Sequence, residues 1–243
     1  MRSKRIFHPE TLAENSRITL DDTAGRHLIK ALRLKAGDEL VLFDGSGKDF
    51  SATLVQAGKR TCIAEVHQVI REEAEPGLRL VLAIGISRGE RMDFSIQKAV
   101  ELGINEIQPL FTERSMVQLK GDRLQNRLTH WRGVIRHACE QSGRSRVPGI
   151  SEPLSLANWL DSFEGNGLML DHRAEKPLVE LSAPGTELTM LVGPEGGLSP
   201  TERQLAEEKG LAGVRLGPRV LRTETAPLAA LAVIQATWGD FRS

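Results

Sequence analysis

Two glycine-rich connections in the C-terminal third carry the residues best suited to bind a small molecule. The first, Leu191-Val-Gly-Pro-Glu-Gly-Gly-Leu-Ser-Pro200, places three glycines directly after an apolar run. Because Gly193, Gly196 and Gly197 lack a Cβ, the backbone could approach a flat ligand closely there. Backbone groups could then hydrogen-bond an adenine edge where side chains would not fit. A plain strand–turn–helix junction is the alternative interpretation of the same glycines.

The second connection, Val214-Arg-Leu-Gly-Pro-Arg-Val-Leu-Arg-Thr-Glu-Thr-Ala226, has the same construction and leads into the final helical run. Thr223 or Thr225 could cap that helix and Arg222 could form a local ion pair with Glu224, which would be purely structural roles. The apolar elements on either side indicate burial, where an arginine is unfavourable unless it is paired or functional. Two connections of matching design suggest one shared pocket.

A basic segment precedes these loops. Residues 113–146 carry eight Lys or Arg against three acids, in a chain whose 32 basic and 32 acidic side chains otherwise balance. On a helical wheel Leu124, Leu128, Trp131 and Ile135 form an apolar stripe flanked by arginines. The flank is either a solvated helix face or a surface that contacts phosphates. With no Tyr and ten other aromatics, base stacking is improbable, so recognition would rest on phosphates and shape.

Other catalytic patterns are weak. Gly85-Ile-Ser-Arg-Gly89 matches G-x-S-x-G, and Asp171-His172 follows in the order of a hydrolase triad. Too little α/β chain precedes Ser87 for such an elbow, so a serine in a strand-to-helix turn is the preferred interpretation. The chain has no metal-ligand spacing, no phosphate-binding P-loop and no G-x-G-x-x-G, so we expect no metal and no ordinary dinucleotide fold.

Two regions with different patterns of predicted secondary structure must position these residues. Over residues 1–72 the sequence predicts a helix at 27–34 and short strands, which together suggest a small barrel; the strands are expected at 17–20, 39–43, 50–55 and 61–70. The polar stretch 71–77 marks the boundary. From residue 78 strands and helices alternate, which predicts a mostly parallel α/β sheet.

In that second region the expected strands are 78–86, 104–111, 168–170, 188–192 and 214–216. The expected helices are 92–102, 123–141 and 156–163, with further helices after the last two strands. Ser199, Pro200 and Glu202 form the sequence signature of a capping box at one of these helix starts.

Composition narrows the class of protein further. The 243 residues are 40% hydrophobic and 26% charged, which excludes disorder. Cys62 and Cys139 are too few for a disulfide framework. The N-terminus lacks an apolar signal region, and no apolar stretch approaches a bilayer span. We therefore expect a soluble, cytoplasmic protein without a membrane partner.

The motifs taken together resemble the ribosomal RNA small subunit methyltransferase E family of the SPOUT superfamily. The match covers nearly the whole chain, and the two C-terminal loops in this order are its most specific part. Arg88 is one departure, at a position where lysine is more frequent. The remaining matching segments are Arg5-Ile-Phe7, Ser87-Arg-Gly-Glu-Arg-Met-Asp93, Lys98-Ala-Val-Glu-Leu-Gly103, Ala138-Cys-Glu-Gln-Ser-Gly-Arg144 and Val147-Pro148.

The resemblance implies a fold and an activity. Residues 1–72 would be a PUA-like RNA-binding β-barrel, and residues 73–243 a SPOUT α/β domain whose chain forms a deep trefoil knot. The protein would act as a homodimer that uses S-adenosylmethionine to methylate N3 of a uridine in 16S rRNA, within the 30S subunit. A non-catalytic RNA-binding protein of ribosome assembly is the alternative, and a serine hydrolase is the least favoured.

The resemblance also implies site residues. The cofactor would contact Leu170, Val192, Gly193, Pro194, Glu195, Gly196, Gly197, Leu216, Gly217, Leu221, Arg222 and Thr223. RNA would contact Arg5, Arg88, Arg114, Lys120, Gln141 and Arg144. For the chemistry, Arg222 suits stabilisation of the uracil anion, because a guanidinium donates without titrating. Glu224 or Glu195 is the expected proton acceptor, which would need a raised pKa.

Overall fold

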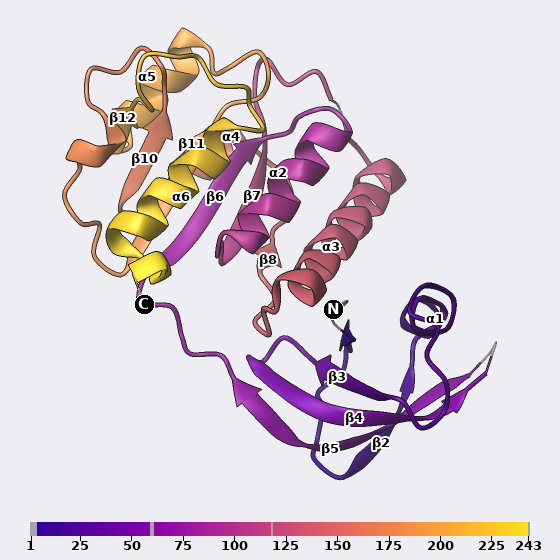
Figure 1. The fold of residues 1–243 in the computed structure, drawn as a ribbon. Coiled ribbons are helices and arrows are strands. Elements are labelled where there is room, and N and C mark those ends of the chain that lie inside the picture. Colours follow the sequence, from indigo (N-terminus) through magenta and orange to yellow (C-terminus); the bar gives the residue numbers. More distant parts are fainter. Residues whose placement is uncertain (1–3, 59–60, 118, 243) are drawn as a thin grey trace. The chain divides into compact units, whose positions relative to one another are not determined.

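The chain folds into two compact units. The computed structural model describes residues 4–58, 61–117 and 119–242 (Figure 1). The first unit comprises residues 1–75 together with 136–147, and the second comprises 76–135 and 148–243. A segment from the middle of the chain therefore belongs to the N-terminal unit, which the sequence pattern did not indicate.

Within its described residues the first unit contains one five-stranded sheet, in the order β1-β3-β4-β5-β2. β1 runs parallel to β3, and the other pairs are antiparallel. The four expected strands are confirmed, with ends shifted by one or two residues; β1 is additional and is too short to show a period of two. The strands are β1 (Arg5–Phe7), β2 (Ser16–Leu20), β3 (Glu39–Phe43), β4 (Lys48–Ala57) and β5 (Cys62–Glu72).

The helical segment of this unit begins earlier than the sequence predicts. Helix α1 spans Asp22–Arg26 and continues as a π-helical turn, η1, over His27–Ala31. The Asp21 carboxylate accepts hydrogen bonds from the N–H groups of Thr23 and Ala24, both at 2.8 Å. Because an acidic side chain at this position satisfies the free N–H groups of the first turn, the helix begins there.

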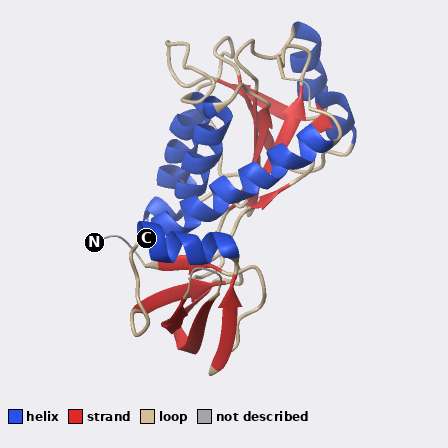
Figure 2. Ribbon diagram, turned by 90° about the vertical axis from the view of Figure 1, so that its right-hand side faces the viewer, coloured by secondary structure: helices blue, strands red, loops and turns tan. Residues whose placement is uncertain are grey.

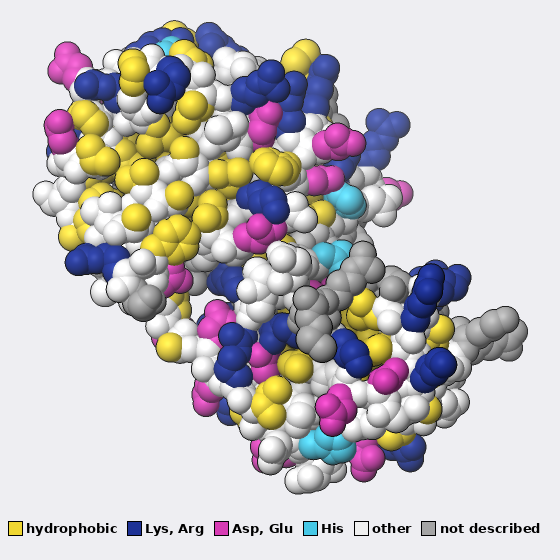
Figure 3. All heavy atoms as spheres, viewed as in Figure 1, with side chains coloured by type: hydrophobic (Ala, Val, Ile, Leu, Met, Phe, Trp, Pro, Cys, Tyr) yellow, Lys and Arg dark blue, Asp and Glu magenta, His cyan; other side chains and the backbone are white. Residues whose placement is uncertain are grey.

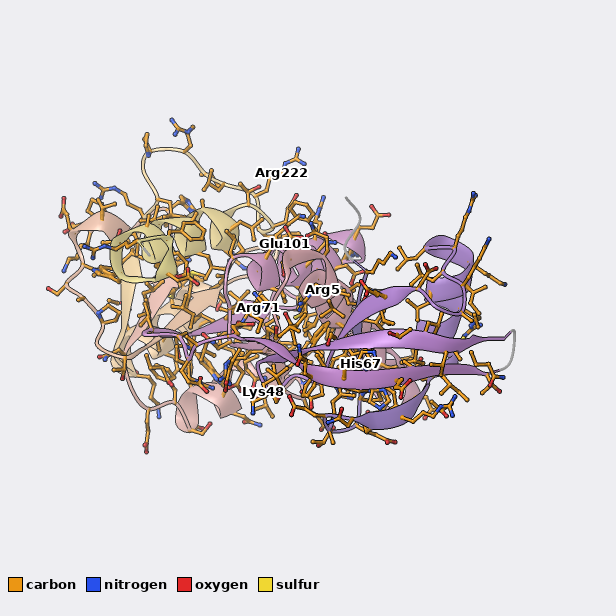
Figure 4. The ribbon with its side chains drawn as sticks, turned by 60° about the horizontal axis from the view of Figure 1, so that its bottom comes forward. Arg5, Lys48, His67, Arg71, Glu101 and Arg222 are labelled. Atoms are coloured by element: carbon orange, nitrogen blue, oxygen red, sulfur yellow. The ribbon has the colours of Figure 1, made fainter. Side chains whose placement is uncertain are left out.

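A buried carboxylate holds the first unit together. Asp49, on β4, has a side chain that is 4% exposed and pairs with Arg5 of β1 and with Nε of Arg71 of β5, the latter at 2.8 Å. Its other oxygen accepts from the Ser145 hydroxyl at 2.5 Å. One buried negative charge thus ties together two neighbouring strands, the edge strand β1 and the segment 136–147. Arg5 and Arg71 are labelled in Figure 4.

The second unit is built on a parallel sheet, as expected. Its described strands follow the order β12-β10-β11-β6-β7-β8, with β9 also paired to β7. All of these pairs are parallel. The strands are β6 (Arg79–Gly85), β7 (Glu106–Phe111), β8 (Gly149–Ile150), β9 (Leu154–Ser155), β10 (Gly167–Leu170), β11 (Glu187–Val192) and β12 (Leu211–Val214).

Helices lie on both sides of this sheet (Figure 2). Ala83 and Leu191 pack with α4 and α5 residues in one buried cluster, and their neighbours Leu82 and Met190 point to the opposite face. Burial on both faces explains the near-continuous apolar runs. The helices are α2 (Glu90–Glu101), α3 (Asp122–Ser142), α4 (Leu156–Asp161), α5 (Pro200–Glu208) and α6 (Ala226–Trp238), with 3-10 turns η2 (Leu178–Glu180) and η3 (Asp240–Arg242).

The last strand lies elsewhere than predicted. We expected it at 214–216, but β12 ends at Val214, which pairs with Leu170. Its sequence, Leu-Ala-Gly-Val, contains a glycine and directly follows Gly210. It therefore lacks the continuous run of large apolar residues by which the other strands are predicted. Gly217 adopts φ +80, a left-handed conformation that turns the chain away from the sheet.

Replacing Asp49 by Asn should lower the free energy of unfolding by about 3 kcal/mol, because Arg5 and Arg71 would lose their shared counter-charge. Urea denaturation followed by circular dichroism would measure the change. Asp161→Asn is the matched control, since Asp161 is 73% exposed in its pair with Lys209 and should cost less than about 1 kcal/mol. Equal losses in the two variants would contradict the role given to Asp49.

Candidate functional site

A pocket of about 590 Å³ lies at the carboxyl ends of β10, β11 and β12. The last residue of each of these strands and the loops that follow supply most of its lining: residues 170–173, 192–198, 214, 216 and 219–224. Because parallel strands end at the same edge of a sheet, their following loops converge there, which is where open α/β sheets bind ligands. The pocket therefore arises from the topology of the sheet.

The first wall is the loop that follows β11. A Cβ on Gly193 would lie 2.9 Å from the Leu198 nitrogen, and one on Gly196 would lie 2.9 Å from Cβ of Arg114. Both glycines are therefore required by packing within the protein, whichever ligand the pocket holds. Beyond the loop, Ser199 and Glu202 form the predicted capping box, with hydrogen bonds of 3.1 and 2.8 Å. The start of α5 thus fixes the end of this wall.

The second wall is the loop between β12 and α6. The Thr223 hydroxyl donates to the carbonyl of Gly193 at 2.8 Å, so the two loops are joined directly. This confirms that the two glycine-rich connections form one pocket. Thr225 occupies the N-cap position of α6 without a side-chain capping bond, so neither threonine caps the helix through its side chain as we had considered.

The expected burial of Arg222 is wrong. Its side chain is 82% exposed, and its Nη1 lies 4.0 Å from Oε1 of Glu224, whose side chain is 17% exposed. The flanking strand and helix are apolar, but the loop itself carries its residues outward: positions 217–220 are all exposed. Arg222 consequently lines the pocket with a side chain that is largely exposed to solvent (Figure 4).

Most of the residues predicted to bind the cofactor come together here. All of the twelve except Gly217 line the pocket, and Gly217 instead forms the exposed turn after β12. The three candidates for the chemistry, Arg222, Glu224 and Glu195, also line it. The arrangement brings two carboxylates and an exposed guanidinium to one cavity.

Glu195 does not have the electrostatics of a base. Its carboxylate accepts the N–H of Arg88 at 3.0 Å and pairs with Arg91 at 3.2 Å. Burial alone would raise the pKa of this carboxyl, but the hydrogen bonds and the nearby guanidinium outweigh it and hold the pKa below its ordinary value. The raised pKa expected of a general base is not found at Glu195, which makes it the weaker of the two candidate proton acceptors.

The residues predicted to bind RNA have different settings. Arg114 lines the pocket and donates to the carbonyl of Gly196 at 3.0 Å. Arg88, Lys120 and Gln141 are exposed. Arg5 is bound to Asp49 and to the Arg144 carbonyl, and the Arg144 side chain is 14% exposed beside Glu73. Arg5 and Arg144 therefore stabilise the first unit.

The sequence interpretation missed the segment after β10. Asp171 binds Arg173 and Arg203, each at 3.3 Å, and all three line the pocket. Their position directly after a predicted strand of a parallel sheet was the available signal. The sequence had suggested Asp171 only as part of a hydrolase triad; Ser87 is instead buried, with its hydroxyl 3.4 Å from the Gly85 carbonyl, in the expected strand-to-helix turn.

The two cysteines are both free and buried. Burial raises the pKa of the Cys139 thiol to about 12, so this group is a poor nucleophile. Across residues 4–58, 61–117 and 119–242, no group of three or more His, Cys, Asp or Glu side chains could hold a metal ion. Among the described helices, none combines the length and the apolar character that a bilayer crossing requires.

Two family models match the two parts of this chain. Residues 74–235 match the family described as RNA methyltransferase domain, and residues 20–66 match the RNA methyltransferase PUA domain. The chain is thus an RNA methyltransferase domain joined to a PUA domain.

Individual relatives identify the family more closely than the two family models do. Ribosomal RNA small subunit methyltransferase E of Buchnera aphidicola subsp. Acyrthosiphon pisum is 31% identical, covering 98% of this chain and 95% of its own. The enzyme of that name from Neisseria gonorrhoeae, solved bound to S-adenosyl methionine, is 38% identical with a TM-score of 0.91, covering 98% and 99%. A putative methyltransferase from Legionella pneumophila, in complex with the bound cofactor SAM, is 34% identical with a TM-score of 0.95, covering 99% and 100%.

This chain belongs to the ribosomal RNA small subunit methyltransferase E family. The family expected from the sequence motifs is therefore confirmed.

Replacing Glu195 by Gln should lower the free energy of unfolding at pH 7 by about 1–2 kcal/mol, because charge-assisted bonds from Arg88 and Arg91 are lost. A carboxyl whose folded pKa lies below its ordinary 4.5 stabilises the fold above that pH and loses this effect as pH falls through the folded pKa. The gap between wild type and variant should therefore shrink below pH 4.5.

Urea denaturation at neutral and acid pH would measure this gap, with Glu180→Gln, an exposed position, as the control. A gap that is independent of pH would contradict the role of the Glu195 charge.

Proposed function

We propose that this protein methylates N3 of a specific uridine in 16S rRNA of the small ribosomal subunit, with S-adenosylmethionine as methyl donor. The observation that carries the proposal is the joined pair of loops after β11 and β12, which encloses the pocket. Two relatives of the same fold, at 38% and 34% identity, were solved with this cofactor bound. An rRNA substrate also implies a cytoplasmic location beside the ribosomes.

The lining of the pocket suits that cofactor. A volume of about 590 Å³ lies within the range of small-molecule sites. Leu170 and Val192 at the ends of β10 and β11, and Leu216 in the loop after β12, can pack against an adenine ring. The backbone of 193–197 offers hydrogen-bonding groups to the edge of that ring. When bound there, S-adenosylmethionine supplies an electrophilic methyl group.

Arg222 and Glu224 are the residues that we assign to the chemistry. N3 of uracil carries an imide proton and is a poor nucleophile until this proton leaves. Glu224 is largely buried and accepts the proton, whereas Arg222 stabilises the charge that then spreads over O2 and O4. Glu195 is engaged by Arg88 and Arg91 and serves instead to fix the loop.

The two sequence regions receive separate roles in this proposal; they differ from the two compact units in where residues 73–75 and 136–147 are placed. Residues 1–72 form a PUA-like barrel that binds RNA, and residues 73–243 form a SPOUT domain whose chain is threaded as a trefoil knot around the cofactor site. Matches to the two family models support the division. Exposed Arg88, Arg114, Lys120 and Gln141 contact RNA, while Arg5 and Arg144 hold the first unit.

A homodimer completes the proposal. Helix α6 is apolar around its whole circumference, which is typical of a helix enclosed on all sides. Only Pro227, Ala230, Leu231, Ile234 and Gln235 are buried, and hydrophobic side chains gather over this part of the surface (Figure 3). A second copy of the chain would cover the half-buried positions, including Ala229, Ala232 and Val233.

The function predicts one modified uridine. After 30S subunits from a strain lacking the modification are incubated with protein and cofactor, reverse transcription across 16S rRNA should stop at a single site, because a methyl group on N3 blocks base pairing. The stop should require S-adenosylmethionine, and subunits incubated without it are the control. Intact cofactor binding without a stop on subunits or naked RNA would reassign the target.

The assigned roles predict separate kinetic effects. Arg222→Ala and Glu224→Gln should each lower kcat by about a hundredfold or more, with cofactor affinity nearly unchanged. Single-turnover methylation and equilibrium dialysis would measure the two quantities. Arg242→Ala and Glu180→Gln are matched controls at exposed positions. Near-wild-type turnover in the first two variants would refute the assignment.

A further inference from the structure

The side chains that line the pocket carry a net positive charge. Among the described residues that line it, three carboxylates face six arginines, an excess of three positive charges with His172 neutral. The carboxylates are Asp171, Glu195 and Glu224, and the arginines are Arg91, Arg114, Arg173, Arg203, Arg219 and Arg222. Lys and Arg side chains also gather on this end of the second unit in the surface view (Figure 3).

Half of these arginines have a clear structural or catalytic partner. Arg91 pairs with Glu195 at 3.2 Å, and Arg222 lies 4.0 Å from Glu224. Arg203 is 22% exposed and is fixed from two sides, by Asp171 at 3.3 Å and by the Leu198 carbonyl at 3.1 Å. These contacts account for all three carboxylates.

The excess charge therefore belongs to the remaining three. Arg173 is 56% exposed and shares a carboxylate that Arg203 already neutralises. Arg114 is exposed and donates to a neutral acceptor, the Gly196 carbonyl. Arg219 is exposed on the loop after β12. The three follow the carboxyl ends of β10, β7 and β12, and all of them line the pocket of which the β11 loop is one wall.

The cofactor does not balance this charge. S-adenosylmethionine has one carboxylate against an ammonium and a sulfonium group, so it is itself a net cation. Its binding brings further positive charge into a cavity that is already positive, which is unfavourable in a partly enclosed site. A second occupant with negative charge would offset the arginines.

We infer that Arg173 and Arg219, together with Arg114, form a phosphate-binding site for the RNA backbone beside the target nucleotide. The inference rests on the proposed function, since it takes RNA as the substrate of the same pocket. A guanidinium donates two parallel hydrogen bonds to phosphate oxygens, and its five N–H groups leave donors for this beside the contacts that Arg173 and Arg114 already make. The phosphate would hold the chain of the substrate while its base enters the pocket.

Cofactor and RNA should then strengthen each other's binding. Phosphate at the rim removes the repulsion that the cofactor meets in the free protein, and coupling between two sites is reciprocal at equilibrium. Removing one rim arginine should accordingly weaken RNA binding, while cofactor binding to the free protein stays equal or becomes tighter. A side chain with a structural role would weaken both.

Filter binding of radiolabelled 16S rRNA over 50–200 mM KCl tests the site, with Arg173→Ala, Arg219→Ala and the control Arg242→Ala. Each rim variant should reduce the slope of log affinity against log salt by about 0.7, the value for one phosphate contact on a single strand. The control should keep the wild-type slope. Equilibrium dialysis with S-adenosylmethionine measures cofactor affinity in the same proteins.

Unchanged slopes in both rim variants would overturn the inference, and so would a parallel loss of RNA and cofactor affinity. The outcomes are separable from those of the proposed function. Reduced slopes without methylation of 30S subunits would leave the phosphate site standing and refute the reaction. Methylation with wild-type slopes would do the opposite.

Discussion

The hydrogen bond from the Thr223 hydroxyl to the Gly193 carbonyl joins the two loops on which the candidate site depends. Each loop leaves the sheet from a different strand, β11 or β12, with β10 between them. The bond holds the two walls of the pocket against each other at this point. It also anchors the loop after β12, in which residues 217–220 are exposed to solvent. The parallel sheet brings the loops near one another, and this contact makes them a pocket.

The charged and apolar side chains lie in different parts of the pocket and have different roles. The three carboxylates fix arginines or face the reacting region, and the apolar residues at the strand ends leave room for a flat ring. The exposed guanidiniums remain as the surplus. A net-neutral chain can thus concentrate positive charge where an RNA phosphate would lie, because charge acts locally at salt concentrations that screen beyond about 10 Å. Overall charge gave no sign of this.

Some features were predictable because their signals are local. The capping box of Ser199 and Glu202, the apolar runs of β6 and β11, and the glycine-rich loops follow from neighbouring residues, and all have the predicted structure. Strand β12 was misplaced because its glycine hides the apolar run. The burial of Arg222 was misjudged for a related reason: the apolar strand and helix beside a loop do not determine whether the loop faces water.

The sequence alone determined the family, the alternation of strands and helices and the two loops that form the pocket, because these depend on residue order and motif. Tertiary structure decided which arginines are buried with a counter-charge and which stay exposed at the pocket. Arg5 was predicted to contact RNA yet is enclosed with Asp49, whereas Arg173 and Arg219 stand at the pocket rim. Arg5 and Asp49 are 44 positions apart in the chain. Local sequence patterns do not show which residues so far apart become neighbours in the fold, so the pairing could not be predicted.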